Sequence, residues 1–168
     1  MKSIIFLALF LLVATASVLF VAVGLAKDGR PEFAAIENIE IGKTKKLSEI
    51  FSFSAQNFCV LQPYQDRVTL NSAFTERVNR YLSERNYVSS EGNFSFVMIG
   101  EEEIEVFTID RSNYLDLLVS DKVTSSVEMA LPKGFVPQDC ARSEFASLLK
   151  IRAHERNYVV LGEMYQGP

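Results

Sequence analysis

Residues 94–109 read FSFVMIGEEEIEVFTI, and this stretch decides the predicted fold class. Residues 94–99 and 104–109 are rich in β-branched and aromatic side chains, as strands are, and Gly100 begins a short acidic stretch between them. Two such runs joined by a short polar turn are typical of a β-hairpin. Since strands joined in this way pair antiparallel, the stretch predicts a mainly antiparallel sheet.

Further strand candidates lie on both sides of this hairpin. Residues 50–64 are rich in phenylalanine, and residues 122–131 contain several β-branched side chains. Two apolar runs, residues 145–153 and 157–163, are separated by a short polar stretch that includes His154, which predicts a terminal hairpin. Residues 114–119 have too few apolar positions to show a period, so a short helix and a strand both stay open there.

One segment, residues 69–85, has helical spacing instead. Thr69 or Asn71 is the expected N-cap, and charged residues lie opposite the apolar ones. The apolar positions that recur every three or four residues are Leu70, Ala73, Phe74, Val78, Tyr81 and Leu82. One amphipathic helix among antiparallel strands predicts a small α+β domain with the helix packed on one face of the sheet.

The N-terminal part contains an unbroken apolar run that begins at Ile4 and ends at Ala26. A transmembrane helix needs about 20 apolar residues, whereas the apolar core of a cleavable signal peptide has about 7 to 15. We therefore favour a transmembrane signal anchor over residues 1–26, in contact with the membrane through residues 4–26. The small residues Gly24 and Ala26 also form a usable cleavage site, so a secreted chain that begins at Lys27 stays open.

The charges that flank this run give conflicting signals about its orientation. Lys2 precedes the run, whereas Lys27 and Arg30 follow it, and this count alone favours a cytoplasmic C-terminal part. A very short basic start before an apolar core is nevertheless the arrangement of an export signal. We expect the C-terminal part to be exported, to the periplasm or the cell exterior.

The rest of the chain has the size of one domain. Residues 27–40 are expected to form a tether, because Gly29 and Pro31 interrupt helices, and Ile39 with Ile41 is expected to begin an edge strand. We expect residues 41–168 to form a single exported α+β domain. The chain of 168 residues has a formal net charge of −4 with well-mixed signs, which predicts no nucleic-acid partner.

Cys59 and Cys140 are the two cysteines of the sequence. In an exported domain, two cysteines predict one disulfide. The alternative, which a cytoplasmic orientation would favour, is a pair of reduced, buried thiols.

No catalytic, cofactor or metal site is expected. A catalytic cysteine needs a nearby base, and nothing in the sequence places His154, the single histidine, near Cys59 or Cys140. Two cysteines and one histidine also lack the paired spacing of structural zinc sites. The acidic stretch at residues 101–105 is expected to be a solvated turn, with a calcium loop or a glycosidase pair as weaker readings.

These features favour a membrane-anchored, non-enzymatic domain of the cell envelope that binds a protein or an envelope component. The alternative is a secreted or periplasmic protein inhibitor, or an immunity-like factor, in which Tyr64, Tyr87 or Tyr114 is an anchor in a partner's cleft. A hydrolase or thiol enzyme is the least favoured class.

Overall fold

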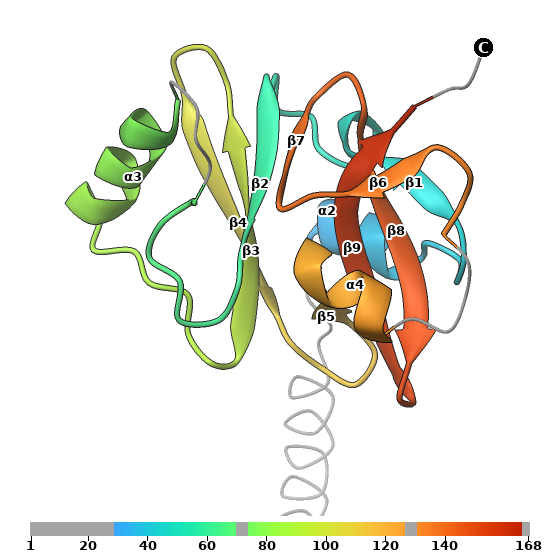
Figure 1. Ribbon diagram of the computed structural model, residues 1–168. Coiled ribbons are helices and arrows are strands. Elements are labelled where there is room, and N and C mark those ends of the chain that lie inside the picture. Colours follow the sequence, from blue (N-terminus) through green and yellow to red (C-terminus); the bar gives the residue numbers. More distant parts are fainter. Residues whose placement is uncertain (1–28, 70–73, 127–130, 166–168) are drawn as a thin grey trace, which may run out of the picture. The chain divides into compact units, whose positions relative to one another are not determined.

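The computed structural model describes residues 29–69, 74–126 and 131–165 and has an α+β architecture with two mainly antiparallel sheets and few helices (Figure 1). The chain divides into two compact units, residues 1–34 and 35–168. The apolar run from Ile4 to Ala26 lies outside the described residues. Within the described ranges, every helix is too short or too polar to cross a membrane.

The first sheet contains the hairpin predicted over residues 94–109, which is confirmed. Its strand order is β4-β3-β2-β7, and all neighbours are antiparallel. In the hairpin, β3 and β4 pair along their full length, from Asn93 opposite Asp110 to Ile99 opposite Ile104. The strands are β2 (Asn57–Leu61), β3 (Asn93–Ile99), β4 (Ile104–Asp110) and β7 (Cys140–Arg142).

The second sheet contains the predicted terminal hairpin, also confirmed as β8 (Ala146–Ala153) and β9 (Arg156–Met164). Its two-residue turn, His154 and Glu155, has positive φ at both positions, 48° and 63°, as a type I′ turn requires. The other strands are β1 (Thr44–Lys46) on β8, and β5 (Asp116–Leu117) and β6 (Phe135–Pro137) on β9. Residues 114–119, for which the sequence allowed either a short helix or a strand, thus contain a short strand, β5, which runs parallel to β9.

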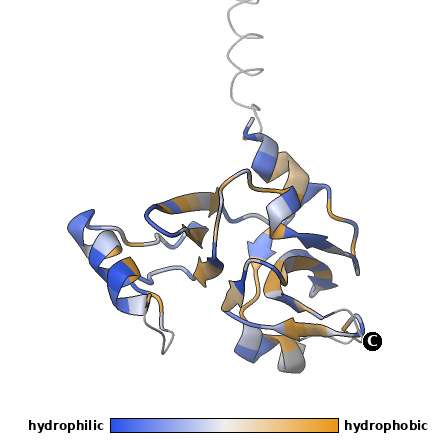
Figure 2. Ribbon diagram, turned by 90° about the horizontal axis from the view of Figure 1, so that it is seen from above, coloured by the Kyte–Doolittle hydropathy of each residue, from blue (hydrophilic) through white to orange (hydrophobic). Residues whose placement is uncertain are grey.

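The helix α3 (Thr75–Glu84) packs on one face of the first sheet, as Figure 1 shows. Its buried residues Val78 and Leu82 belong to one cluster with alternate residues of β2 and β3: Cys59, Leu61, Val97 and Ile99. Residues two apart on a strand share a face, so this set defines the face that α3 covers. The rest of α3 is mainly hydrophilic (Figure 2).

The expected disulfide is present within this cluster. Cys59 and Cys140 lie directly opposite each other on β2 and β7, and their sulfurs are bonded at 2.02 Å. The other face of the sheet is aromatic. Phe51 packs there against the rings of Phe58, Phe96 and Phe107, with ring centroids 5.1 to 6.1 Å apart.

The strand predicted over residues 122–131 is wrong. A helix, α4 (Ser120–Ser126), occupies its first half, and residues 127–130 lie outside the described residues. The backbone N–H of Ser120 donates to the carboxylate of Asp139 at 2.9 Å, and Val123 is buried. A partner far along the chain therefore stabilises a first helical turn that local β-branched residues do not favour.

Other boundaries also differ from the sequence prediction. Within residues 50–64, only β2 is a strand. A 3-10 turn, η1 (Leu47–Glu49), and then a loop precede it. The helix α3 begins at Thr75, so Thr69 is not its N-cap, and the predicted positions Leu70, Asn71 and Ala73 lie outside the described residues.

The expected tether contains the helix α2 (Pro31–Glu37), in which proline occupies the first position, where its missing N–H is tolerated. Ile36 and Ile39 are buried, and Lys150 donates a hydrogen bond to the carbonyl of Glu37. The edge strand expected at Ile39 and Ile41 is wrong, since the strand at this edge is β1. Residues 35–40 belong to the same compact unit as the sheets.

We predict that reduction of the Cys59–Cys140 disulfide lowers the free energy of unfolding. The two cysteines are 81 residues apart, and loop-closure entropy predicts a loss of roughly 4 kcal/mol. The measurement is urea denaturation of the oxidised and the reduced protein, whose side chains are otherwise identical. Equal urea midpoints would contradict the prediction.

Candidate functional site

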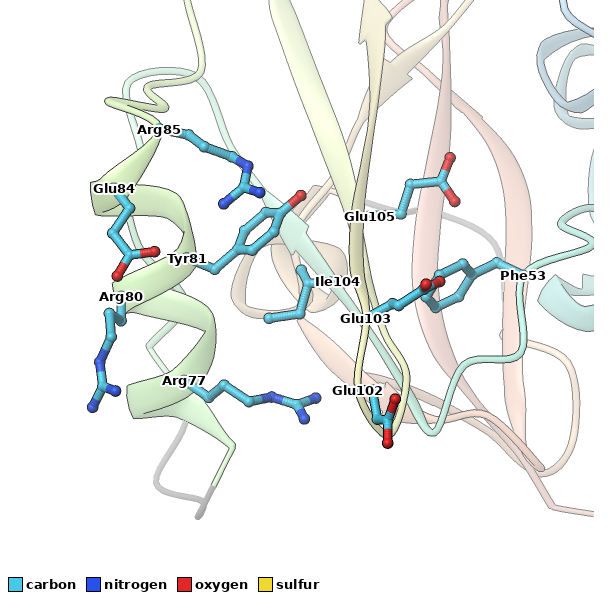
Figure 3. A pocket seen from close by; sticks show the side chains of 10 residues that line it. All are labelled: Phe53, Arg77, Arg80, Tyr81, Glu84, Arg85, Glu102, Glu103, Ile104 and Glu105. Carbon is cyan, nitrogen blue, oxygen red and sulfur yellow. The ribbon is translucent and has the colours of Figure 1, made fainter.

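A cleft of about 650 Å³ lies between α3 and the end of the β3–β4 hairpin (Figure 3). The helix contributes Arg77, Arg80, Tyr81, Glu84 and Arg85, and the other side contributes Phe53, Glu102, Glu103, Ile104 and Glu105. Positions three or four apart on a helix share a side, which is why these five helix residues line one cleft. The sequence pattern places Tyr81 with the apolar positions and the charged residues opposite them, so it does not predict that Tyr81 and the arginines line one cleft.

Arg77 joins the helix to the hairpin. Figure 3 shows its side chain extending from α3 toward the turn, where its two terminal nitrogens donate to the carbonyls of Gly100 and Glu101. Its Nε is buried without a hydrogen-bond partner among the described residues. Gly100 leaves little room for a side chain at this turn, because an added Cβ would lie 3.1 Å from the carbonyl oxygen of Ser54 and 3.2 Å from the ring of Phe53.

The other helix residues remain accessible to a ligand. The guanidinium of Arg85 lies 3.7 Å from the ring centroid of Tyr81, a cation–π contact that orients both side chains. Arg80 is exposed at the mouth of the cleft. The helix side of the cleft therefore presents a net positive charge beside an aromatic ring, with three arginines against Glu84.

The hairpin side presents the opposite charge. Glu102, Glu103 and Glu105 are all exposed, so the acidic stretch is solvated, as expected. Ile104 and Val106 pack against the cluster beneath α3. By strand alternation, Glu105 lies on the other face of β4, toward Phe53. Residues on both faces of β4, at the turn end of the hairpin, thus line the cleft.

A buried carboxylate lies away from this cleft, at Asp116 on β5. Its side chain is only 2% exposed and accepts from Arg111 at 2.6 and 2.9 Å and from Arg156 at 3.0 Å. The hydrogen bond to Asp116 is the main cause that raises the pKa of Arg111. Both carboxylate oxygens have cationic partners, so Asp116 connects β5, β9 and the segment after β4 rather than binding a ligand.

A second buried carboxylate, Glu163, connects the two sheets. It lies on β9 and accepts from the backbone N–H of Arg142 on β7 at 2.8 Å, from the guanidinium of Arg142, and from the hydroxyl of Tyr165. Burial raises the pKa of Glu163, but the hydrogen bonds from Tyr165 and Arg142 outweigh it, so the net pKa is lowered. The ionised form is therefore the one that the fold stabilises.

The structure does not bring the catalytic candidates together. Cys59 and Cys140 are bonded to each other, and His154 is exposed in the β8–β9 turn. Across residues 29–69, 74–126 and 131–165, no three His, Cys, Asp or Glu side chains form a group that could bind a metal ion.

Two of the three tyrosines considered as partner anchors are exposed. The exposed fraction is 67% for Tyr64 and 75% for Tyr114. Tyr87 is half-buried, and its hydroxyl is hydrogen-bonded to Ser95 and Thr108.

We predict that Glu163→Gln destabilises the protein at pH 7 by about 1.5 to 3 kcal/mol, the range for hydrogen bonds to a charged group. The lowered pKa means that the ionised form contributes its full stability above about pH 4.5 and loses it as the pH falls through the folded-state pKa. Urea unfolding at pH 7 and at pH 3 measures this. The difference between wild type and variant should shrink at pH 3, and a constant difference would contradict the assignment.

No family model, curated protein or solved structure matches this chain, so its function is inferred from the chemistry of the cleft and not from a relative.

Proposed function

We propose that the chain is a membrane-anchored, non-enzymatic domain of the cell envelope that binds a segment of another protein. The observation that carries this proposal is the α3–hairpin cleft, whose two sides have opposite charge around a partly apolar floor. Arginine and tyrosine are enriched in protein-binding hot spots, and Arg80, Arg85 and Tyr81 lie together here. A charged, open cleft suits a polar protein segment better than a small apolar ligand.

The histidine, the cysteines and the buried carboxylates lie outside the cleft, whose own carboxylates are the exposed Glu84, Glu102, Glu103 and Glu105, and this favours a binding role over an enzymatic one. General acid–base catalysis needs a carboxylate or histidine that can exchange a proton with a substrate. Asp116 and Glu163 are buried and bonded to arginines, and both cysteines form the disulfide. These groups have structural partners.

The membrane part of the proposal rests on the apolar run of residues 4–26, which is long enough for a signal anchor. The disulfide supports export, because disulfides persist in oxidising compartments. The alternative, cleavage after Ala26, would give a secreted or periplasmic form of the same domain.

For the anchor, we predict that the native protein in the membrane fraction has an intact N-terminus. Intact-mass spectrometry after detergent extraction should give the mass of a chain that retains residues 1–26. The same sample should contain no titratable thiol when denatured without reductant, because export and the disulfide are linked. A mass that begins at Lys27 would contradict the anchor, and two free thiols would contradict export.

For the binding role, we predict that a photo-crosslinking amino acid in place of Arg80 captures one stoichiometric protein partner in native membranes. The matched control has the same amino acid in place of Arg152, an exposed arginine on β8 that does not line the cleft. The variant Arg80→Glu should weaken the partner's binding by about fivefold, in line with a rim charge worth roughly 1 kcal/mol. Identical products from both positions, or none, would contradict this use of the cleft.

A second candidate is the inhibitor or immunity-like factor. The exposure of Tyr64 and Tyr114 favours it, since a large aromatic side chain on the surface is a good anchor for a partner's cleft. The double variant Tyr64→Ala/Tyr114→Ala would then lose the partner, whereas Arg80→Glu would retain it.

A further inference from the structure

We propose that the partner binds as an added β-strand along the outer edge of β4, with its side chains in the α3–hairpin cleft. This inference rests on the proposed function and specifies its mode of binding. Strand addition to an open sheet edge is a recurring way in which domains bind extended protein segments.

The length of β4 sets it apart from the other edge strands that the structure describes. β4 has 7 residues and is the terminal strand of its sheet. The opposite edge of that sheet, β7, has 3 residues, and in the second sheet β1 has 3, β5 has 2 and β6 has 3. Natural proteins keep edge strands short to prevent unwanted pairing. A long edge beside a cleft is therefore consistent with pairing that the protein uses.

The register of the hairpin shows which backbone groups of β4 point outward. Gly100 donates to Glu103 at 2.9 Å, and Arg111 donates to Gly92 at 2.7 Å, so both ends of the ladder are fixed. In an antiparallel pair, hydrogen-bonded positions alternate, which assigns Glu105 to pairing with β3. Ile104 and Val106 then direct their N–H and C=O groups away from β3, where no strand among the described residues pairs.

The two sides of the cleft specify the chemistry of the added segment. Its alternate side chains would lie on opposite faces of the extended sheet. On one face they would meet Arg85 and Tyr81, which point from α3 toward β4, and on the other Glu105 and Phe53. The best complement is an extended segment in which acidic residues alternate with basic or aromatic ones.

A second copy of this chain fits the edge less well. Antiparallel pairing of two β4 strands in one continuous sheet places both α3 helices on the same face. Each helix would then meet a copy of its own net positive charge, because Arg77, Arg80 and Arg85 outnumber Glu84 on the helix side of the cleft, and such self-repulsion disfavours this pairing. A segment of another protein is therefore the favoured occupant.

The test starts with a displayed library of random nine-residue peptides, selected on the full-length chain in detergent micelles. The selected peptides are synthesised, and their Kd is measured for wild type, Val106→Pro and Val106→Ala. Proline at position 106 removes an outward N–H and leaves the β3 ladder intact, since proline is tolerated on an edge strand when its nitrogen faces solvent. Alanine shortens the same side chain but keeps the N–H.

Strand addition predicts peptides with alternating charge whose Kd for Val106→Pro is at least tenfold weaker than for Val106→Ala. Amide hydrogen exchange of wild type supplies a second readout that does not depend on the folding of a variant. Bound peptide should slow exchange at Ile104 and Val106 at least tenfold and leave Glu105, already bonded to β3, little changed.

The other outcomes separate this inference from the proposed function. Peptides that bind Val106→Pro and Val106→Ala equally, without slowing exchange at Val106, would overturn strand addition and leave the binding role intact. A selection that enriches no peptide would count against binding of a protein segment altogether. If the wild type sediments as a dimer and Val106→Pro sediments as a monomer, the segment that binds to the edge of β4 belongs to a second copy of this chain and not to another protein.

Discussion

Two-sided burial of β3 is the constraint on which the rest of this structure depends. Phe94, Phe96 and Met98 on one face and Val97 with Ile99 on the other are all at most 1% exposed. A sheet that is apolar on both faces must be covered on both. On one face, only Val78 and Leu82 of α3 are buried, so polar contacts add to the attachment. Arg77 donates hydrogen bonds to the hairpin turn. The side-chain amide of Asn79 is hydrogen-bonded to the backbone N–H and C=O of Val68.

The same need for cover explains why the candidate site lies where it does. The helix that covers one face of the sheet stands beside the edge strand, and its polar side faces the turn between β3 and β4. Arg77 fixes the spacing between the helix and the turn, and its neighbours on the same side of the helix become the cleft lining. Arg77 thus has a structural role, and the residues proposed to bind a partner lie about one helical turn away from it.

Strong local patterns were enough to predict both long hairpins, because period-two alternation and turn residues are read within a few positions. The disulfide was expected from two cysteines in a domain taken to be exported, and the structure contains it. The helix α4 was not predictable in this way, because Asp139, which bonds its first N–H, lies 19 residues further along the chain. The cleft escaped prediction for a similar reason, since Arg77 and Gly100 meet only after the sheet has formed, 23 residues apart.

The disulfide also bears on how many partner segments one chain could bind. It joins β2 to β7, so the edge of the sheet opposite β4 ends in a short strand that is covalently attached. That edge strand, β7, has only 3 residues, and the N–H of Arg142 on it already donates to Glu163, whereas β4 has 7 residues with no strand beyond it among the described residues. Strand addition at β4 would therefore give one segment per chain and no growth in the opposite direction. Clustering of such domains would then depend on the number of matching segments in the partner.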